Sequence, residues 1–573
     1  MSNSSTPTPG ILYVTMQPKP SLPSSQFHDW YNNEHGPGRL RLPFCQNGFR
    51  YRASDLSQDQ NQAQPTGTQE KPEWMAIYDI SDMDWLTKDV YTKLRAAPVQ
   101  SQRERDTMKQ IHVDRRFYDL VSSVQVPDFQ ALESVSAEGS KNVMVAVFLT
   151  LKEGAHEDEL ARWYDEEHIA LLQKVPGWRR TRRFVTSYLD LADGKTKEFL
   201  TLHEYAPENG LGGPEFEAAT TTEWTKKIMQ GSVDRKNRRV YDLYYTFGPA
   251  PRDLEALSSP DTFPAASTDG LTKTRPAHAT TPEAGTQAKF PIIESYITTP
   301  DGVQLPYTLT GSPSPDAPLL VLINSILTTS SIWTAFTAHF LSTSPEYRIL
   351  SFNTRGRTAL PPSSTTPITV DTLSKDVIAL LDALRAQTAA LVGVSLGGAT
   401  ALNTALTHPT RISAFVACDT NSAAPAGNPK AWGERIAMCE AEGARSAAGE
   451  PIVGHELAEA TVRRWFTAQS YADAALAGNI DEVKQMVASN SLDGFRRSVN
   501  ALFEYDFRPL MGAFQGQGAF LVGAGDGVLP KTMAAMADGL GSGVELKSIE
   551  GAGHLPMVER PREVAEFVAR FLG

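Results

Sequence analysis

A chain of 573 residues, 41% of them hydrophobic and 21% charged, is long enough for about three globular domains. Its net charge of -12 disfavours nucleic acid as a partner, because phosphate binding needs a basic surface. No apolar run reaches the length of a membrane span, and the polar N-terminus lacks the apolar core of a signal peptide. Three scattered cysteines, without metal-ligand spacing, fit a reducing compartment. We therefore expect a cytoplasmic protein with no membrane partner.

The first half of the chain contains the same pattern of elements twice. A strand-like run and a helix ending in Trp30-Tyr31-Asn32-Asn33-Glu34-His35 return as a second run ending in Trp163-Tyr164-Asp165-Glu166-Glu167-His168. The spacing stays constant as far as Pro43 and Pro176, and later strand-like runs match as well. The repeat predicts two β-α-β-β-α-β units of the ferredoxin-like type, over residues 10–125 and 138–247. Two such units can close face to face into an α+β barrel and bury both sheets.

The repeated W-Y-x-x-E-H signature, with a proline beyond it, resembles the EthD-like, dimeric α+β-barrel family over residues 10–247. The resemblance implies a pocket enclosed by the two units. It also implies lyase, isomerase or dehydratase chemistry on a polyketide-like substrate, with His35 or His168 as a general base. The alternative is that both histidines cap their helices and hold the following loops. The residues alone leave the two readings open.

Residues 248–290 separate this half from the rest of the chain. The segment is rich in Pro, Ser, Thr, Ala and Asp and shows no apolar periodicity. This composition predicts a linker that tethers two independently folding parts.

From residue 291 onwards, short apolar runs alternate with helical stretches. Such alternation predicts a mostly parallel sheet covered by helices. Residues 427–512 interrupt the alternation, lack strand-like runs and are expected to form a helical cap. The second half, 291–573, is therefore predicted to be an α/β domain.

A nucleophile motif lies in the middle of this second half. Gly393-Val394-Ser395-Leu396-Gly397 fits the G-x-S-x-G pattern between a buried-strand run and a helix, the setting of a nucleophile elbow. Asp526 and His554 each follow a later strand, which gives the order nucleophile, acid, base of the α/β-hydrolase fold. His554 would remove the proton of Ser395, and Asp526 would orient His554 and stabilise its charge. Asp419, just after the preceding strand, is the rival acid.

Two backbone N–H groups are expected to bind the oxyanion that forms during attack. One belongs to Leu396, directly after the nucleophile. The other is expected from the loop 324–328, with Ile326 as the best candidate.

The second half resembles the 3-oxoadipate enol-lactonase-like family over residues 291–573. The resemblance is carried by Asn324-Ser325, Ser331-Ile332-Trp333, Asn353-Thr354-Arg355-Gly356, the elbow, Trp432-Gly433-Glu434-Arg435 and Arg464-Trp465-Phe466-Thr467. The chain departs from the family at Arg357, where relatives usually have His, and in its N-terminal barrel. The resemblance implies that Trp432, Arg435, Arg464 and Trp465 line a substrate pocket, although ordinary cap packing would also explain them.

These observations predict a serine hydrolase that cleaves a small lactone, ester or ketone through Ser395, His554 and Asp526. A bifunctional enzyme with a catalytic barrel is the alternative. We expect a small-molecule substrate, no cofactor and no metal, and homo-oligomerisation stays open.

Overall fold

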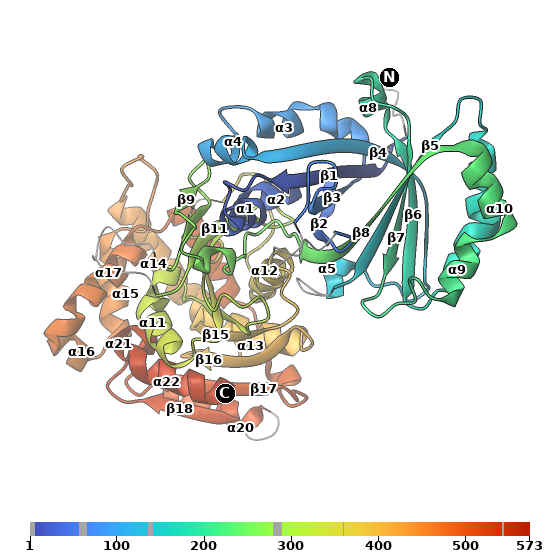
Figure 1. The fold of residues 1–573 in the computed structure, drawn as a ribbon. Coiled ribbons are helices and arrows are strands. Elements are labelled where there is room, and N and C mark those ends of the chain that lie inside the picture. Colours follow the sequence, from blue (N-terminus) through green and yellow to red (C-terminus); the bar gives the residue numbers. More distant parts are fainter. Residues whose placement is uncertain (1–5, 57–65, 136–140, 279–288, 359, 541–543) are drawn as a thin grey trace. The chain divides into compact units, whose positions relative to one another are not determined.

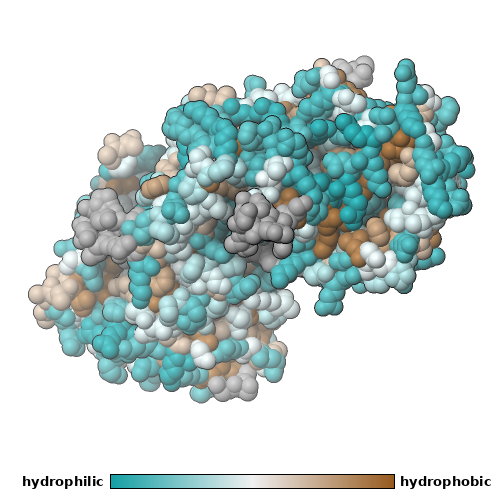
Figure 2. All heavy atoms as spheres, in the orientation of Figure 1, coloured by the Kyte–Doolittle hydropathy of each residue, from teal (hydrophilic) through white to brown (hydrophobic). Residues whose placement is uncertain are grey.

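The computed structural model describes residues 6–56, 66–135, 141–278, 289–358, 360–540 and 544–573 (Figure 1). The chain divides into two compact units, one formed by residues 1–251 with 267–269 and the other by 252–266 with 270–573. On the face drawn in Figure 2, hydrophilic residues cover most of the surface. Within the described ranges, every helix is too short or too polar to cross a bilayer.

The first unit is a closed barrel of antiparallel strands. Its strands are β1 (Gly10–Pro18), β2 (Cys45–Ala53), β3 (Trp74–Ile80), β4 (Ile111–Gln125), β5 (Val143–Leu151), β6 (Trp178–Thr186), β7 (Phe199–Tyr205) and β8 (Val233–Thr246). The order around the barrel is β1-β3-β2-β8-β5-β7-β6-β4. Read as β4-β1-β3-β2 and β8-β5-β7-β6, the two halves have the same internal order. The predicted barrel is therefore present, with every sequence-matched strand in place.

Alternate residues along each strand face the lumen or the outer side of the barrel. On β1, Tyr13 packs into the luminal core, whereas Leu12 and Val14 pack against the outer helical layer. The helices of this unit are α1 (Ser24–Trp30), α2 (Gly36–Leu40), α3 (Asp89–Thr92), α4 (Gln102–Met108), α5 (Leu132–Val135), α6 (Glu157–Trp163), α7 (Ile169–Leu172), α8 (Tyr188–Ala192), α9 (Pro214–Thr220) and α10 (Glu223–Lys227). Trp30 and Trp163 are each 1% exposed, and burial of such a side chain contributes about 2–3 kcal/mol. The repeated tryptophans therefore anchor matching helices to the barrel.

The second unit is built on a ten-stranded sheet of order β18-β17-β16-β15-β13-β14-β12-β11-β10-β9. Its strands are β9 (Ala265–Ala266), β10 (Lys273–Arg275), β11 (Ile292–Thr298), β12 (Gln304–Gly311), β13 (Leu319–Ile323), β14 (Arg348–Phe352), β15 (Ala389–Val394), β16 (Ile412–Cys418), β17 (Gln517–Gly523) and β18 (Glu545–Ile549). Six strands, β13 to β18, are parallel to their neighbours within this set. Their carboxyl ends therefore lie along one edge of the sheet.

Helices alternate with these strands as the sequence predicted. They are α11 (Thr334–Thr343), α12 (Val370–Ala383), α13 (Leu396–Thr407), α20 (Leu529–Gly539), α21 (Pro556–Glu559) and α22 (Pro561–Leu572). The expected cap is also helical, with α14 (Asn428–Glu442), α15 (His455–Trp465), α16 (Ala468–Ala472), α17 (Ala477–Ala488), α18 (Leu492–Ser498) and α19 (Arg508–Met511).

The expected linker 248–290 differs from the structure in its first part. Residues 252–266 and 270–278 fold onto the second unit, where β9 and β10 extend the sheet and β10 pairs with β11. Leu254 and Leu257 are fully buried. The composition of the segment did not indicate this docking, because it depends on two buried leucines and on backbone hydrogen bonds at the sheet edge. Residues 279–288 lie outside the described residues.

Candidate active site

Ser395 occupies a strained turn between β15 and α13. Its backbone has φ 59° and ψ -119°, a region that non-glycine residues rarely adopt. The turn is held from both sides, because the Ser395 N–H donates to the Cys418 carbonyl at 2.9 Å and Thr420 Oγ1 donates to the Ser395 carbonyl at 2.8 Å. Strain concentrated at one half-buried serine at the end of a central strand is typical of a nucleophile elbow.

The glycines of the motif allow the backbone to pass this turn. A Cβ at Gly397 would lie 2.3 Å from the Ile323 carbonyl oxygen, and one at Gly393 would lie 2.1 Å from the Gly397 carbonyl oxygen. A Cβ at Gly398 would meet the Cys418 carbonyl oxygen at 2.7 Å. The first turn of α13 therefore packs directly on the ends of β13 and β16, which only glycine permits.

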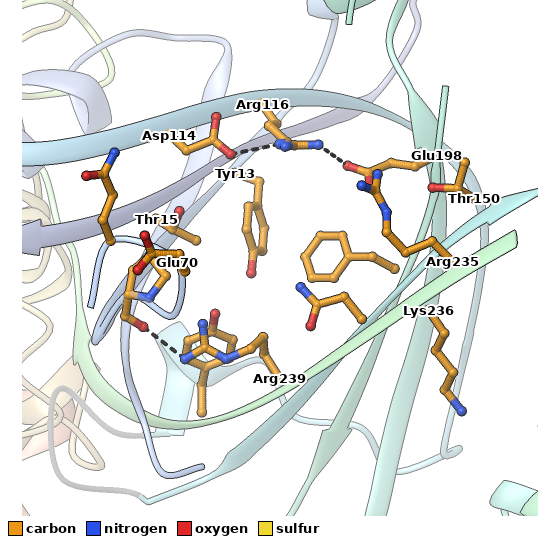
Figure 3. A pocket seen from close by; sticks show the side chains of 15 residues that line it. Tyr13, Thr15, Glu70, Asp114, Arg116, Thr150, Glu198, Arg235, Lys236 and Arg239 are labelled. Atoms are coloured by element: carbon orange, nitrogen blue, oxygen red, sulfur yellow. Dashed lines mark hydrogen bonds and ion pairs between the residues drawn. The ribbon is translucent and has the colours of Figure 1, made fainter. Parts of the chain in front are cut away.

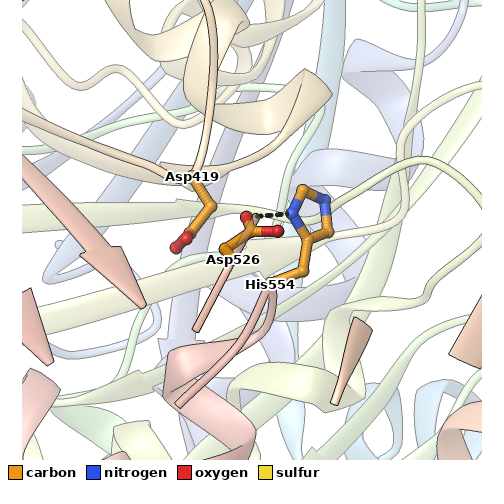
Figure 4. A group of neighbouring side chains, drawn as sticks. All are labelled: Asp419, Asp526 and His554. Atoms are coloured by element: carbon orange, nitrogen blue, oxygen red, sulfur yellow. Dashed lines mark hydrogen bonds and ion pairs between the residues drawn. The ribbon is translucent and has the colours of Figure 1, made fainter. Parts of the chain in front are cut away.

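His554 and Asp526 meet at the carboxyl edge of the same sheet. Asp526 follows β17, His554 follows β18, and His554 Nδ1 lies 2.7 Å from Asp526 Oδ2 (Figure 4). Both side chains are largely buried, at 13% and 15% exposure. This hydrogen bond fixes which imidazole nitrogen faces the acid and leaves Nε2 as the nitrogen available for proton transfer.

Asp419, the rival acid, lies behind Asp526 and does not contact His554 by a hydrogen bond. It is 1% exposed, and its Oδ1 accepts from the Gly523 N–H at 2.9 Å. Burial, and then the charge of Asp526, raise the pKa of Asp419 well above its usual range. The structure therefore makes Asp526 the partner of His554, and burial of Asp419 favours its protonated form.

The ligand atoms of Asp419, Asp526 and His554 lie within 4.8 Å of one another, so the cluster has the size of a metal site. Metal ligands must be deprotonated, which the raised pKa of Asp419 opposes. The arrangement suits proton transfer better than metal binding.

Two further residues, Trp465 and Glu559, position His554 and its loop, and no sequence pattern indicated this role for Glu559. The His554 N–H donates to the Trp465 carbonyl at 2.7 Å, and the two rings stack with centroids 5.6 Å apart. Glu559, 2% exposed, accepts from the Gly553 N–H at 2.6 Å and from Ser470 Oγ at 2.5 Å. An acid in a short helix is usually solvated, so its role in holding the histidine loop was not predictable.

The loop after β13 carries the expected oxyanion donor Ile326 and is fully buried. Asn324 Nδ2 donates to the Thr328 carbonyl at 2.6 Å and thereby closes the loop on itself. Contact between Gly397 and the end of β13 brings this loop to the first turn of α13, where Leu396 supplies an N–H without a partner inside the helix. Arg357 supports the loop from outside, since its Nη1 donates to Asn490 Oδ1 at 3.2 Å and Asn490 donates to the Leu327 carbonyl.

The cap arginines lie near the acid–base pair. Arg435 stacks on Trp432, with its Cζ 4.4 Å from the ring centroid. Burial, and then the charge of Arg464, lower the pKa of Arg435, while Arg464 in turn interacts electrostatically with Asp526. Within the part of the chain that the structure describes, neither guanidinium forms an ion pair. Arg464 thus places a positive charge within electrostatic reach of Asp526.

The two barrel histidines hold neighbouring elements in the first unit. His35 Nδ1 lies 2.9 Å from Glu104 Oε1, and His168 Nδ1 lies 3.1 Å from the Ala219 carbonyl. Burial lowers the pKa of both imidazoles, to about 4 for His168. Among the described residues, no hydrogen bond or ring contact joins His35 to His168, and their role as a general base stays a prediction.

Comparisons with known proteins concern the second unit. Residues 320–567 match the alpha/beta hydrolase family, a range that includes Ser395, Asp526 and His554. The chain is 30% identical over 252 residues to 3-oxoadipate enol-lactonase 2 of Acinetobacter baylyi, covering 43% of this chain and 85% of that protein. It is 26% identical over 260 residues to 3-oxoadipate enol-lactonase 1 of the same organism, covering 45% and 89%. The crystal structure of the enol-lactonase from Burkholderia xenovorans is 26% identical and covers 48% of this chain and 99% of that chain, with a TM-score of 0.42.

Proposed function

The chain belongs to the alpha/beta hydrolase family, and from that premise we propose that it is a serine hydrolase acting on a small, carboxylate-bearing lactone or ester. One observation carries the proposal. A serine in a strained elbow and a histidine 2.7 Å from a carboxylate follow parallel strands of one sheet, at its carboxyl edge. A lactone or ester is favoured over a ketone because the relatives are named enol-lactonases.

The proposed reaction begins when Ser395 Oγ attacks the substrate carbonyl carbon. His554 Nε2 takes the hydroxyl proton, and Asp526 stabilises the imidazolium through Nδ1–H. The N–H groups of Leu396 and Ile326 bind the negative oxygen of the tetrahedral intermediate, a contribution of about 3–4 kcal/mol for one such donor in other hydrolases.

Collapse of this intermediate breaks the carbonyl C–O bond. His554 gives its proton to the leaving oxygen, which stays attached to the acyl chain when the substrate is a lactone. Water then attacks the acyl-enzyme, again with His554 as base, and releases the acid and free Ser395. The net change is addition of one water across the C–O bond.

The carboxylate on the substrate is inferred from the cap. Arg464 lies within electrostatic reach of Asp526, Arg435 lies within such reach of Arg464, and neither forms an ion pair among the described residues. Arg is suited to bind a carboxylate through two parallel hydrogen bonds. Trp432 and Trp465 add flat apolar surface beside them. The four cap residues would thus orient an acid-bearing substrate toward Ser395.

For the first unit, we propose a tandem pair of EthD-like ferredoxin-like units. The support is the identical strand order in the two halves, together with a π-helical turn at the same place in each repeat, Tyr31–His35 and Tyr164–His168.

Turnover of a pair of 4-nitrophenyl esters tests this function. Ser395→Ala should abolish hydrolysis, whereas Ser413→Ala, an exposed serine on β16, should not change it. Against a succinate monoester, Arg435→Gln and Arg464→Gln should each lower kcat/KM by about tenfold or more, with the neutral acetyl ester little affected. Arg463→Gln, on the same helix as Arg464, is the matched control. Full turnover by Ser395→Ala would refute the mechanism, and equal losses on both esters would refute the carboxylate.

A further inference from the structure

The lumen of the barrel contains a cavity of about 490 Å³, a volume typical of small-molecule sites. It is lined by Tyr13, Thr15, Gln69, Glu70, Pro72, Asp114, Arg116, Phe148, Thr150, Glu198, Arg235, Lys236, Asn237, Arg239 and Tyr241. All of these residues belong to the first unit. His35 and His168 do not line it, so the cavity is distinct from the predicted histidine site.

The cavity has an aromatic floor and a polar mouth because alternate residues of each strand face the lumen. Tyr13, Phe148 and Tyr241 belong to the luminal core of the barrel. The rings of Tyr13 and Phe148 meet edge to face with centroids 5.6 Å apart. Thr15 and Thr150 lie further along the strands of Tyr13 and Phe148, and the charged side chains of the mouth come from β4, from β8 and from the segments before β3 and β7 (Figure 3). A flat ring would fit the floor through the same edge and face contacts.

Two hydroxyl groups on this floor lack sufficient partners. Tyr13 is 2% exposed and Tyr241 is fully buried, and neither hydroxyl makes a hydrogen bond to any other group in the described part of the chain. The two phenols interact with each other, but if one donates to the other, the second O–H still has no acceptor. Burial raises the pKa of both phenols, so both keep their protons. A buried hydroxyl donor without an acceptor costs free energy, and an oxygen atom of a bound ligand would remove that cost by accepting its hydrogen bond.

The charged side chains at the mouth are matched within the protein. Arg116 pairs with Asp114 at 2.9 Å and with Glu198 (Figure 3). Arg239 pairs with Asp55 at 3.0 Å. Four lining cations, Arg116, Arg235, Lys236 and Arg239, are matched in number by the lining acids Glu70, Asp114 and Glu198 together with Asp55, the partner of Arg239. An ionic ligand would therefore meet no excess of opposite charge in the cavity, and its removal from water would cost free energy.

We propose that the barrel lumen binds an uncharged, oxygen-bearing aromatic compound, whose ring lies among Tyr13, Phe148 and Tyr241 and whose oxygen accepts a hydrogen bond from the tyrosine hydroxyls. The ring matches the aromatic floor, the oxygen satisfies the free phenolic donor, and neutrality matches the balanced mouth. This site is independent of Ser395 and of the hydrolysis proposed for the second unit.

Three related probes test the proposal on the full-length protein. Fluorescence titration should show saturable binding of 2-naphthol, with naphthalene about tenfold weaker because it lacks the oxygen and 2-naphthoate weaker because it is charged. Hydrogen exchange should show protection by 2-naphthol in β1 and β8. Protection confined to the second unit, or no binding up to the solubility limit, would overturn the assignment.

Conservative variants locate the hydrogen bond. Tyr13→Phe with Tyr241→Phe should reduce binding of 2-naphthol to the level of naphthalene and leave naphthalene binding unchanged, which also shows that the barrel remains folded. Tyr205→Phe is the matched control, since Tyr205 packs on the outer face of β7. If the double variant binds 2-naphthol as tightly as the parent protein does, the phenols are not the donors and the proposal fails.

Discussion

Replacement of Asp526 by asparagine distinguishes the role of Asp526 from that of Asp419, the other acid in this cluster. The parent pair is 2.7 Å apart, with the carboxylate accepting from Nδ1–H. An asparagine amide can instead donate to Nδ1, which would place the imidazole proton on Nε2 and prevent that nitrogen from accepting the serine proton. In a serine protease this change lowers kcat by about 10⁴, and we expect a loss of about 10³–10⁴ here. At about 1.36 kcal/mol per tenfold, that equals about 4–5.5 kcal/mol of barrier.

The matched variant Asp419→Asn should lower activity by less than about threefold. Burial raises the pKa of Asp419 and favours its neutral form, and Asp419 accepts from the Gly523 N–H, a role that the asparagine oxygen can keep. Its folded pKa is raised above the unfolded value, so the parent protein loses stability as pH rises from about 4 towards the folded pKa. Asp419→Asn should remove that loss.

The assay is kcat/KM for a 4-nitrophenyl ester as a function of pH, with chemical unfolding of each variant at the same pH values. The reasoning would be refuted if Asp419→Asn lost as much activity as Asp526→Asn while both remained folded. It would also be refuted if Asp526→Asn kept more than about a tenth of the parent rate.

Three other changes probe the frame of the site and the barrel. Gly397→Ala places a Cβ 2.3 Å from a backbone oxygen, so it should lower the free energy of unfolding by about 2 kcal/mol or more and remove most of the ester turnover. Gly433→Ala, with open space around the new Cβ, should change neither stability nor turnover. Glu559→Gln should lower kcat and the unfolding temperature, because its amide group would face N–H and O–H donors that now reach a carboxylate. His168, whose pKa burial lowers to about 4, stays neutral when folded, so barrel stability should fall by about 3 kcal/mol as pH drops from about 6.5 to about 4. Unfolding by denaturant should show that loss reduced in His168→Gln and retained in a variant of the exposed His156; an unchanged loss in His168→Gln would contradict the assignment.

The proposed catalytic residues of the second unit were predictable because each lies next to a strong local signal. Ser395 is bracketed by glycines that a tight turn requires, and Asp526 and His554 directly follow short apolar strands. The choice between Asp526 and Asp419 was harder, since both follow strands, and only the three-dimensional hydrogen bond to His554 separates them. Glu559 escaped prediction because two of its partners, the Thr467 N–H and the Ser470 hydroxyl, come from a segment 92 and 89 residues away in sequence.

In the first unit, periodicity and repetition predicted the strands, and the family resemblance implied a pocket between the two repeats, but neither indicated which residues line the cavity. The tryptophan and histidine repeats are easy to see, yet they belong to the outer helical layer, where Trp30 and Trp163 are packed. The luminal residues Tyr13 and Tyr241 read in sequence as ordinary strand aromatics, because burial of their hydroxyls without enough acceptors depends on closure of the barrel. The docking of residues 252–266 and 270–278 was concealed for a similar reason, since pairing at a sheet edge depends on backbone groups and not on composition.

The most direct test of the central claim is to identify the residue that carries the covalent intermediate. The full-length protein would be treated with a fluorophosphonate, digested, and its peptides analysed by mass spectrometry, with Ser395→Ala treated in parallel. We predict one adduct per chain, on Ser395, and loss of ester turnover in proportion to its formation. Turnover that persists in fully labelled protein, or an equal adduct in Ser395→Ala, would contradict the account.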